Sequence, residues 1–261
     1  MNKNTVSILV PAMLLVAFPL CAPILLAQDA RTAVQAGLTR MVPDKRPPDD
    51  ILLTGQRTDP SGTVPFRMTI KGKDQARYEI GTGATQVTTT FSKGAGSRVA
   101  AGKVEILQSY TARERPALIP FLDLLAEADA PALQVTDQGA FSIGNLAARR
   151  YTLKLPDPEP QKRMFGRPLD EESDVYIDLA SGLIVRSERW VMAENSMDVR
   201  FRRITEFSDY RSVNGLAIPF RVAETVQTPT RAPFQSVYVV VSASVNTGVD
   251  DTVFTGTEPR Q

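Results

Sequence analysis

The sequence contains no histidine and only one cysteine, and these two shortages exclude much of the usual chemistry of enzymes and metalloproteins. Histidine is the general base of many catalytic sites and the commonest metal ligand in proteins. The one cysteine, Cys21, lies in an apolar N-terminal run, so the remainder of the chain has no thiol for a disulfide or a structural zinc site. We therefore expect no catalytic residue, no metal site and no cofactor.

Other patterns that carry chemistry are also weak. Carboxylates are paired in three places, at Asp49-Asp50, Glu171-Glu172 and Asp250-Asp251. All three pairs stand in polar, loop-like surroundings, where forming turns and keeping the chain soluble are simpler roles than glycosidase-type catalysis. The glycines of GTGATQ (81–86) lead into a β-rich segment and not into a helix, so they lack the context of a phosphate-binding loop.

The chain also lacks a surplus of charge. It has 30 basic and 29 acidic residues, which gives a formal net charge of +1. Recognition of phosphates requires a positive surplus on at least one face, so we expect no nucleic-acid partner. Two short basic groups, Arg149-Arg150 and the arginines of 200–203, are interrupted by acidic residues and are interpreted as solvated faces.

The N-terminal segment has the pattern of a secretory signal peptide over residues 1–27. Lys3 precedes an uncharged apolar run, and polar residues follow it, which predicts cleavage near Ala27 or Ala30. The run is also long enough for an uncleaved membrane anchor. Cys21 raises the alternative of a lipoprotein, but Phe-Pro-Leu before it lacks the small side chain of a lipobox. The pattern favours a cleaved signal and export to the periplasm.

An N-terminal helix and linker are predicted at 28–48, with Val34, Leu38 and Met41 at helical spacing. The remaining chain, 49–261, is predicted to form one β-rich domain. In VPFRMTIK (64–71) apolar and polar side chains alternate, which is typical of a half-buried strand with one wet face.

Two turn signals predict long hairpins further along the chain. Asn214-Gly215 lies between two strand-like segments and is the strongest short-range hairpin signal, and Ser181-Gly182 is a second. Pro219 has no N–H to donate, so we expect it on an edge strand or at a bulge. Trp190, the only tryptophan, is expected to belong to the core.

One strongly apolar helix is predicted near 116–128. Ile119 and Leu124 widen its apolar stripe until most of the circumference is apolar, and Pro120 fits only if the helix begins near Ile119. Such a helix requires a large apolar surface to lie against. The stripe itself consists of Leu118, Phe121, Leu122 and Leu125, at positions i, i+3, i+4 and i+7.

The order of these features resembles the LolA-like periplasmic proteins, which include outer membrane lipoprotein-sorting proteins, LolB and the RseB sensor domain. Three segments carry the resemblance: YIDLASGLIVRSE (176–188), FSDYRSVNGLAIPFRV (207–222) and DDTVF (250–254). The second is similar to the family's Tyr-x4-Gly-x3-Pro hairpin. The early strands read IKGKDQARYEI and lack the Arg-Pro pair whose arginine latches the helical lid in the family's carrier.

The resemblance implies an α+β fold in which a curved antiparallel sheet forms an unclosed half β-barrel, with helices covering its concave face. It also implies a carrier or binding protein for a lipid-like or acylated ligand, held between the sheet and the helical lid. The alternative from the same family is an RseB-like module that docks an envelope protein and carries no lipid. The expected partners are thus a lipid or acylated lipoprotein, or an envelope protein, and polar loops and Pro219 suggest a monomer.

The predicted ligand-binding residues come from one strand and the apolar helix. An alternative is that they are plain core residues with no ligand. They are Val64, Phe66, Met68, Ile70, Leu118, Phe121, Leu122 and Leu125.

Overall fold

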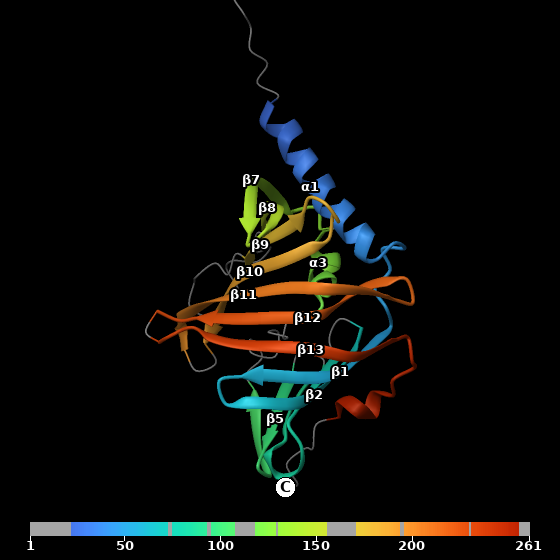
Figure 1. Ribbon diagram of the computed structural model, residues 1–261, viewed down its shortest axis with the longest axis vertical. Helices are drawn as coiled ribbons and strands as arrows, with labels where there is room; N and C mark the ends of the chain where they lie inside the picture. Colours follow the sequence, from blue (N-terminus) through green and yellow to red (C-terminus); the bar gives the residue numbers. More distant parts are fainter. Residues whose placement is uncertain are drawn as a thin grey trace, which may run out of the picture.

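The computed structural model describes residues 22–72, 75–92, 95–107, 118–128, 130–155, 171–193, 196–229 and 231–255. Within these residues one antiparallel sheet of thirteen strands dominates the fold (Figure 1). Its spatial order is β6-β5-β4-β3-β2-β1-β13-β12-β11-β10-β9-β8-β7, so adjacent strands in the sheet are also consecutive in sequence, except for the pair β1 and β13. The half-barrel thus consists of two meanders joined through β1 and β13.

The strands are β1 Asp50–Asp59, β2 Gly62–Lys71, β3 Gln75–Ile80, β4 Val87–Ser92, β5 Ala95–Ala100, β6 Lys103–Leu107, β7 Gln134–Ile143, β8 Leu146–Leu155, β9 Glu171–Asp178, β10 Ile184–Ala193, β11 Ser196–Val213, β12 Leu216–Gln227 and β13 Phe234–Val245. The α-helices are α1 Ala22–Met41 and α3 Pro120–Ala128, and the 3-10 helices are η1 Gly83–Thr85 and η3 Asp251–Phe254. The polar segment 156–170, which precedes β9, lies outside the described residues.

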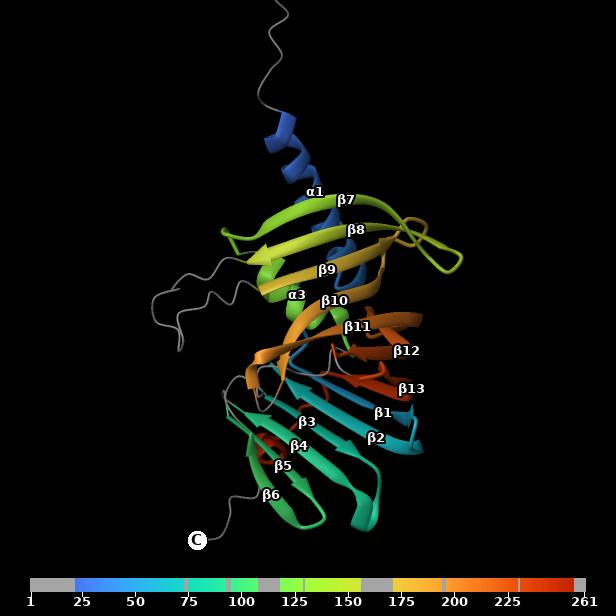
Figure 2. The same ribbon diagram turned by 90° about the vertical axis from the view of Figure 1, so that its left-hand side faces the viewer.

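The sheet is curved and remains open (Figure 2). β6 and β7 lie at its two ends, and they do not pair with each other within the described residues. α1 packs against β7, β12 and α3, and both helices lie on the concave side. The predicted unclosed half-barrel is confirmed, although the helices cover only part of the concave face.

α1 begins earlier than the sequence pattern indicated and extends through the predicted cleavage point. Its buried stripe consists of Ala30, Val34, Leu38 and Met41, so the predicted spacing is confirmed. All four residues follow Ala27. No helix in the described part of the chain has the length and apolar character needed to cross a membrane.

The alternation of β2 places Phe66, Met68 and Ile70 in the core, as predicted. The opposite face of this strand is less exposed to solvent than expected, because Thr69 is buried as well. The C-terminal segment of the chain covers this face. Lys71 Nζ donates to the carbonyl of Val249 at 2.7 Å, and the segment continues into the 3-10 helix η3, whose Phe254 is buried and which contacts β3 and β4.

Both predicted hairpins form. Asn214 and Gly215 have φ angles of 48° and 82°, the two positive values that a type I′ turn requires between β11 and β12. At the β9–β10 turn, Gly182 has a φ of 70°, and the Asp178 carboxylate accepts the N–H and the hydroxyl of Ser181. These hydrogen bonds hold the pKa of Asp178 below its usual value.

Pro219 occupies a position that the sequence analysis did not foresee. β12 is an interior strand of the sheet, so the expectation of an edge strand is wrong. Pro219 pairs with Tyr210 on β11, but the described pairing of β12 with β13 runs only from Arg221 to Val226. The missing N–H therefore falls where β12 has no described partner on that side.

Asp50, at the start of β1, joins the two meanders. Its carboxylate is 2% exposed and accepts hydrogen bonds from Thr247 N and Oγ1 and from Gly248 N, each at 2.8 Å, and from Val249 N at 3.1 Å. Burial acts to raise the pKa of Asp50, but these hydrogen bonds outweigh it and leave the pKa below its ordinary value. The predicted role of Asp50 in forming a turn is confirmed, but the predicted role in keeping the chain soluble is wrong, because its carboxylate is buried.

The convex face carries a polar cluster on β8–β11 that the sequence analysis missed. Glu188 is 3% exposed and accepts from the Tyr176 hydroxyl at 3.0 Å, from Arg186 at 2.5 Å and from Arg202. Burial and the nearby Glu188 raise the pKa of Tyr176 to about 12. The interpretation of the basic groups as solvated faces holds for Arg202, whose side chain is 38% exposed, but it is wrong for Arg203, whose side chain is 14% exposed on the concave face.

Trp190 contradicts the expectation that it belongs to the core, since it is 59% exposed. The alternation of β10 gives the reason. Trp190 is two and four residues from Glu188 and Arg186, so it points to the convex face with them.

Candidate functional site

The concave face of the sheet beneath α3 is the candidate ligand site. Of the predicted ligand-binding residues, Phe66, Met68 and Ile70 on β2 are buried in the main core cluster. Leu118 and Phe121 belong to the same cluster, and Leu122 and Leu125 pack against it while remaining partly exposed. Val64 is half-buried, outside this cluster, opposite Arg57 of β1. The fold brings seven of the eight predicted residues together in one apolar cluster.

The site is closed in this structure. The buried liners Phe66, Met68, Ile70, Leu118 and Phe121 are at most 5% exposed, so a ligand can reach them only if the packing around them opens. α3 has nine residues, and a helix of this length is marginal in isolation, so its stability comes from packing. Pro120 is its first residue, where the absent N–H causes no loss, so the helix begins where the sequence analysis required it to begin if Pro120 was to fit. The first two residues of the predicted range 116–128 lie outside the described residues.

One arginine ties α3 to α1. The Arg31 guanidinium donates to the carbonyl oxygens of Ala128 at 3.0 Å and Ala130 at 2.9 Å. Carbonyls at the C-terminal end of a helix lack intrahelical donors and carry partial negative charge, so a cation there is favourable. This contact holds the end of α3 against α1 and therefore over the concave face.

Two tyrosines mark the polar limits of the apolar cluster. Tyr210 donates its hydroxyl to the carbonyl of Ile184, and burial raises the pKa of Tyr210 well above its usual value. Tyr238 packs edge-on against Phe66, with ring centroids 5.3 Å apart, while the Arg57 guanidinium carbon lies 5.9 Å from the Tyr238 centroid. Burial, and then Glu224, raise the pKa of Tyr238. Tyr238 thus stands where the apolar surface meets charged groups.

Three solved structures resemble the chain over nearly their whole length. A DUF1329 family protein from Desulfovibrio piger has a TM-score of 0.54 and 12% identity, covering 88% of this chain and 97% of that chain. A LolA superfamily protein from Nitrosomonas europaea has a TM-score of 0.51 and 10% identity, with coverage of 87% and 97%. A putative outer membrane lipoprotein-sorting protein domain from Vibrio parahaemolyticus has a TM-score of 0.52 and 10% identity, with coverage of 88% and 97%.

The chain has a LolA-like fold. At this level of sequence identity the likeness establishes the fold alone. Neither the known protein families nor the curated protein sequences give a match.

The contact made by Arg31 can be compared with the lid latch of the LolA-like carrier. The sequence lacks the Arg-Pro pair associated with the lid latch of the family's carrier. In this structure an arginine on α1, and not one on the early strands, makes the polar contact with the end of α3. Sequence reasoning missed it because Arg31 stands within a helical pattern that gives no sign of its partner.

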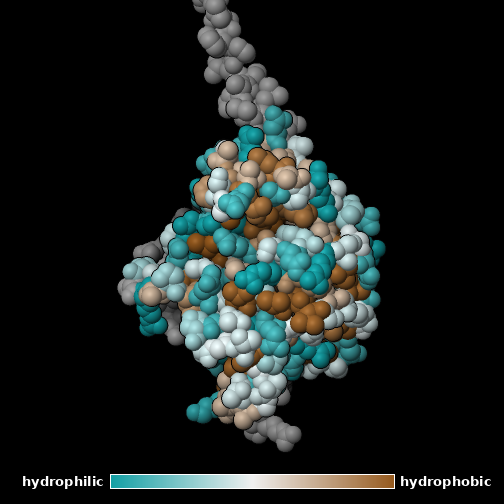
Figure 3. All heavy atoms as spheres, viewed as in Figure 1, coloured by the Kyte–Doolittle hydropathy of each residue, from teal (hydrophilic) through white to brown (hydrophobic). Residues whose placement is uncertain are grey.

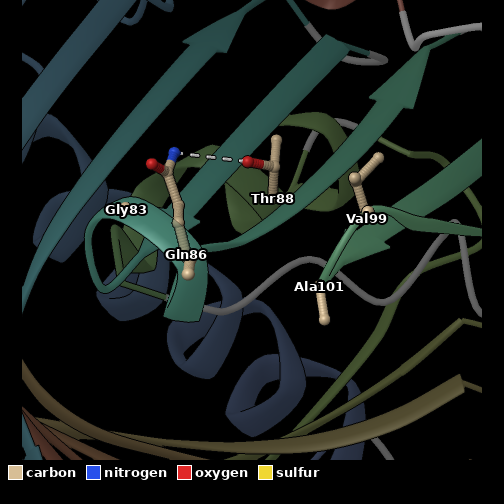
Figure 4. A pocket seen from close by; sticks show the side chains of 7 residues that line it. Gly83, Gln86, Thr88, Val99 and Ala101 are labelled. Atoms are coloured by element: carbon tan, nitrogen blue, oxygen red, sulfur yellow. Dashed lines mark hydrogen bonds between the residues drawn. The ribbon is translucent and has the colours of Figure 1, made fainter.

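The LolA-like sheet also has a pocket of about 630 Å³ on its other side, between η1 and the β5–β6 turn (Figure 4). Thr88 pairs with Val99 on the face opposite Phe91, so this pocket is separate from the concave face. Its walls are small side chains and Gln86, which donates to Thr88 at 3.4 Å. No charged residue lines it, and we assign it no role.

Sequence reasoning also missed most of the strand residues that complete the apolar surface. The sequence did carry a signal for them, since the residues of AIPFRV in β12 alternate in the same way as those of β2, and this alternation predicts one buried apolar face. Among the described residues, no group of three or more Asp, Glu, His or Cys could hold a metal ion. The missed residues are Ile51, Leu53, Ile218, Phe220, Val222 and Val240.

Proposed function

We propose that this protein is a non-enzymatic carrier or binding protein of the bacterial cell envelope that holds a lipid-like or acylated ligand between the sheet and α3. The observation that carries the proposal is a curved apolar face against which α1 and the short helix α3 pack. Contact with that face removes apolar surface from water, which contributes roughly 0.8 kcal/mol for each buried methylene of an acyl chain. The N-terminal sequence pattern supports export to the periplasm.

The contacts of α3 support its role as a lid. A nine-residue helix that depends on packing, with Arg31 binding its last carbonyls, can move without disturbing the strand pairing of the sheet. A lipoprotein-sorting description accompanies one of the similar solved structures, which agrees with an acylated ligand.

The proposal is tested by organic extraction and mass spectrometry of protein purified from the periplasm, followed by titration of the delipidated protein with a fluorescent fatty acid. We expect co-purified acyl species and saturable binding. Protein that yields no acyl species and binds no probe would contradict the proposal.

A second candidate is the docking of an envelope protein on the convex face. Val239 and Val241 of β13 are exposed apolar residues, on the face opposite Val240. Figure 3 shows apolar surface over the middle of the sheet, where β13 lies. Substitution Val241→Asp would abolish capture of such a partner without changing fatty-acid binding, and the reverse pattern would reject docking at this face.

A further inference from the structure

The concave face changes from apolar to charged along its strands. On β12, Ile218, Phe220 and Val222 are followed on the same face by Glu224. On β11, Phe207 gives way to Thr205 and then Arg203 toward the same end. The register places Ser236 and Thr205 on either side of Glu224, and Arg57 pairs with Tyr238. One end of the concave face is therefore polar. This polar end consists of Arg57, Asp59, Arg203, Glu224 and Ser236.

The first arginine of the polar end is well held. Arg57 Nη1 lies 2.7 Å from Asp59 Oδ2, and Arg57 Nη2 donates to Ser236 Oγ at 3.0 Å. Ser236 is itself buried and pairs with Glu224 across β12 and β13. These contacts fix a guanidinium beside the Tyr238 ring.

The second arginine is not satisfied in the same way. Arg203 Nε is 3.6 Å from Glu224 Oε2, which is too long for a hydrogen bond, and each side chain is 14% exposed. Arg203 Nε and Nη1 and Glu224 Oε2 are buried and make no hydrogen bond within the described part of the chain. Buried polar groups are nearly always paired with protein, water or ligand, so these donors indicate a site where another group binds.

The unpaired donors of the polar end favour an anion. Arg203 Nε and Nη1 make no hydrogen bond among the described residues, and Arg57, held by Asp59, is the second guanidinium of the polar end. A guanidinium offers donors in a planar fork that matches carboxylate and phosphate oxygens. Tyr238 joins this charged end to the apolar surface at Phe66.

We infer that the polar end binds the anionic head group, a carboxylate or a phosphate monoester, of an amphiphile whose acyl chain lies on the apolar surface under α3. Arg203 is the donor to the head group, and Arg57 supplies fixed positive charge. This inference rests on the proposed function and names the ligand class that the same site selects.

The first experiment compares ligands on the unmodified, delipidated protein by calorimetry. Oleate and oleoyl lysophosphatidate carry the anionic head group, and monooleoylglycerol is the neutral counterpart with the same chain. We expect the anionic ligands to bind about tenfold more tightly or better, since a charge-assisted hydrogen bond contributes that much. Equal affinity for the neutral ligand would overturn the inference and leave the proposed function intact. Binding of none of the three would contradict both.

The second experiment replaces the donor. Arg203→Met should weaken oleate binding by about tenfold or more and leave monooleoylglycerol binding within about twofold. Glu224→Gln removes the competing carboxylate and should strengthen oleate binding. Arg221→Met, an exposed arginine on the opposite face of β12, is the matched control and should change neither. Loss of both ligands in Arg203→Met with native circular dichroism, or loss of neither, would overturn the inference.

A third arm separates a lipid head group from a free anion. Inorganic phosphate alone should bind far more weakly than oleoyl lysophosphatidate, because it gains nothing from the apolar surface. Phosphate that binds as tightly as the lysophospholipid, in a manner that depends on Arg203, would show an anion site with no lipid ligand.

Discussion

Glu188 and Glu224 are both buried carboxylates that face arginines, but they lie on opposite faces of the same sheet. On the convex face, Glu188 accepts from Tyr176, Arg186 and Arg202. On the concave face, Glu224 lies 3.6 Å from Arg203 and leaves Oε2 without a hydrogen bond among the described residues. Both oxygens of Glu188 have partners, although Arg186 Nε is buried without one, whereas Glu224 Oε2 and the Nε and Nη1 donors of Arg203 have none among the described residues.

This difference indicates different roles for two charged clusters of similar composition. A buried ion cluster whose members satisfy each other holds strands together, and loss of one member leaves its partners buried and uncompensated. A cluster with unmet hydrogen bonds contributes little to folding but is prepared for a ligand. We therefore expect the convex cluster to contribute mainly to stability and the concave cluster to ligand binding.

The largest expected effect is on the convex face. Glu188→Met leaves the Arg186 and Arg202 guanidinium groups and the Tyr176 hydroxyl without their shared acceptor, and should lower the free energy of unfolding by about 3–5 kcal/mol in urea titrations. The matched control is Glu206→Met, since Glu206 lies 3.4 Å from Arg186 but is 46% exposed and should cost less than about 1 kcal/mol. Equal losses in the two variants would remove the distinction between the clusters.

The concave pair should respond in the opposite direction. Replacing both charges in Arg203→Met/Glu224→Met should leave the free energy of unfolding unchanged or raise it by about 1–4 kcal/mol, because the desolvation of two poorly paired ions is removed. The same urea titration measures it. A loss of several kcal/mol would show that the concave cluster is as structural as the convex one.

The variant Tyr176→Phe isolates the contribution of Tyr176 to stability at alkaline pH. Its pKa of about 12 in the folded protein exceeds the ordinary value of 10.0, so the unfolded chain releases this proton first as the pH rises. The resulting stability is fully present below pH 10 and is lost between about pH 10 and 12. Tyr176→Phe should flatten the decline in unfolding free energy over this range. A decline as steep as that of the wild type would place the titrating groups elsewhere.

The smallest effect concerns the lid. Arg31→Met removes the two hydrogen bonds to the end of α3 and should speed hydrogen exchange of the α3 amides by about threefold to tenfold, with little change in global stability. Arg40→Met is the matched control, because Arg40 is also on α1 but donates to the carbonyl of Ser181 at 3.0 Å. If both variants exchange alike, Arg31 does not hold the lid.

Patterns of local origin predicted much of this fold. The β2 alternation and the Asn214-Gly215 turn depend on neighbouring residues, and both are confirmed. The apolar helix predicted near 116–128 forms as α3 from Pro120 to Ala128. The half-barrel itself was predicted from the order of the motifs, which resembles that of LolA-like proteins. The ligand role of the residues under α3 stays a prediction, because burial alone is equally the property of a core.

Contacts between distant strands were the ones that sequence reasoning missed. Trp190 and Arg203 sit in alternating segments, and the face that each occupies depends on a register set by the whole sheet. The residues near Arg203 in the sequence do not predict that it faces Glu224, and the residues near Arg31 do not predict that it contacts the end of α3. Charged residues were therefore assigned to solvent by default, which was wrong where the sheet curves over them.

The most direct test of the account is photolabelling with a fatty acid that carries a diazirine on its acyl chain, followed by peptide mapping. We predict saturable labelling of peptides from β2, at Phe66–Ile70, and from α3, at Phe121–Leu125, competed by unlabelled oleate. Labelling confined to the convex face of β13, at Val239–Val241, or labelling that oleate does not compete, would contradict a ligand site between the sheet and its helix.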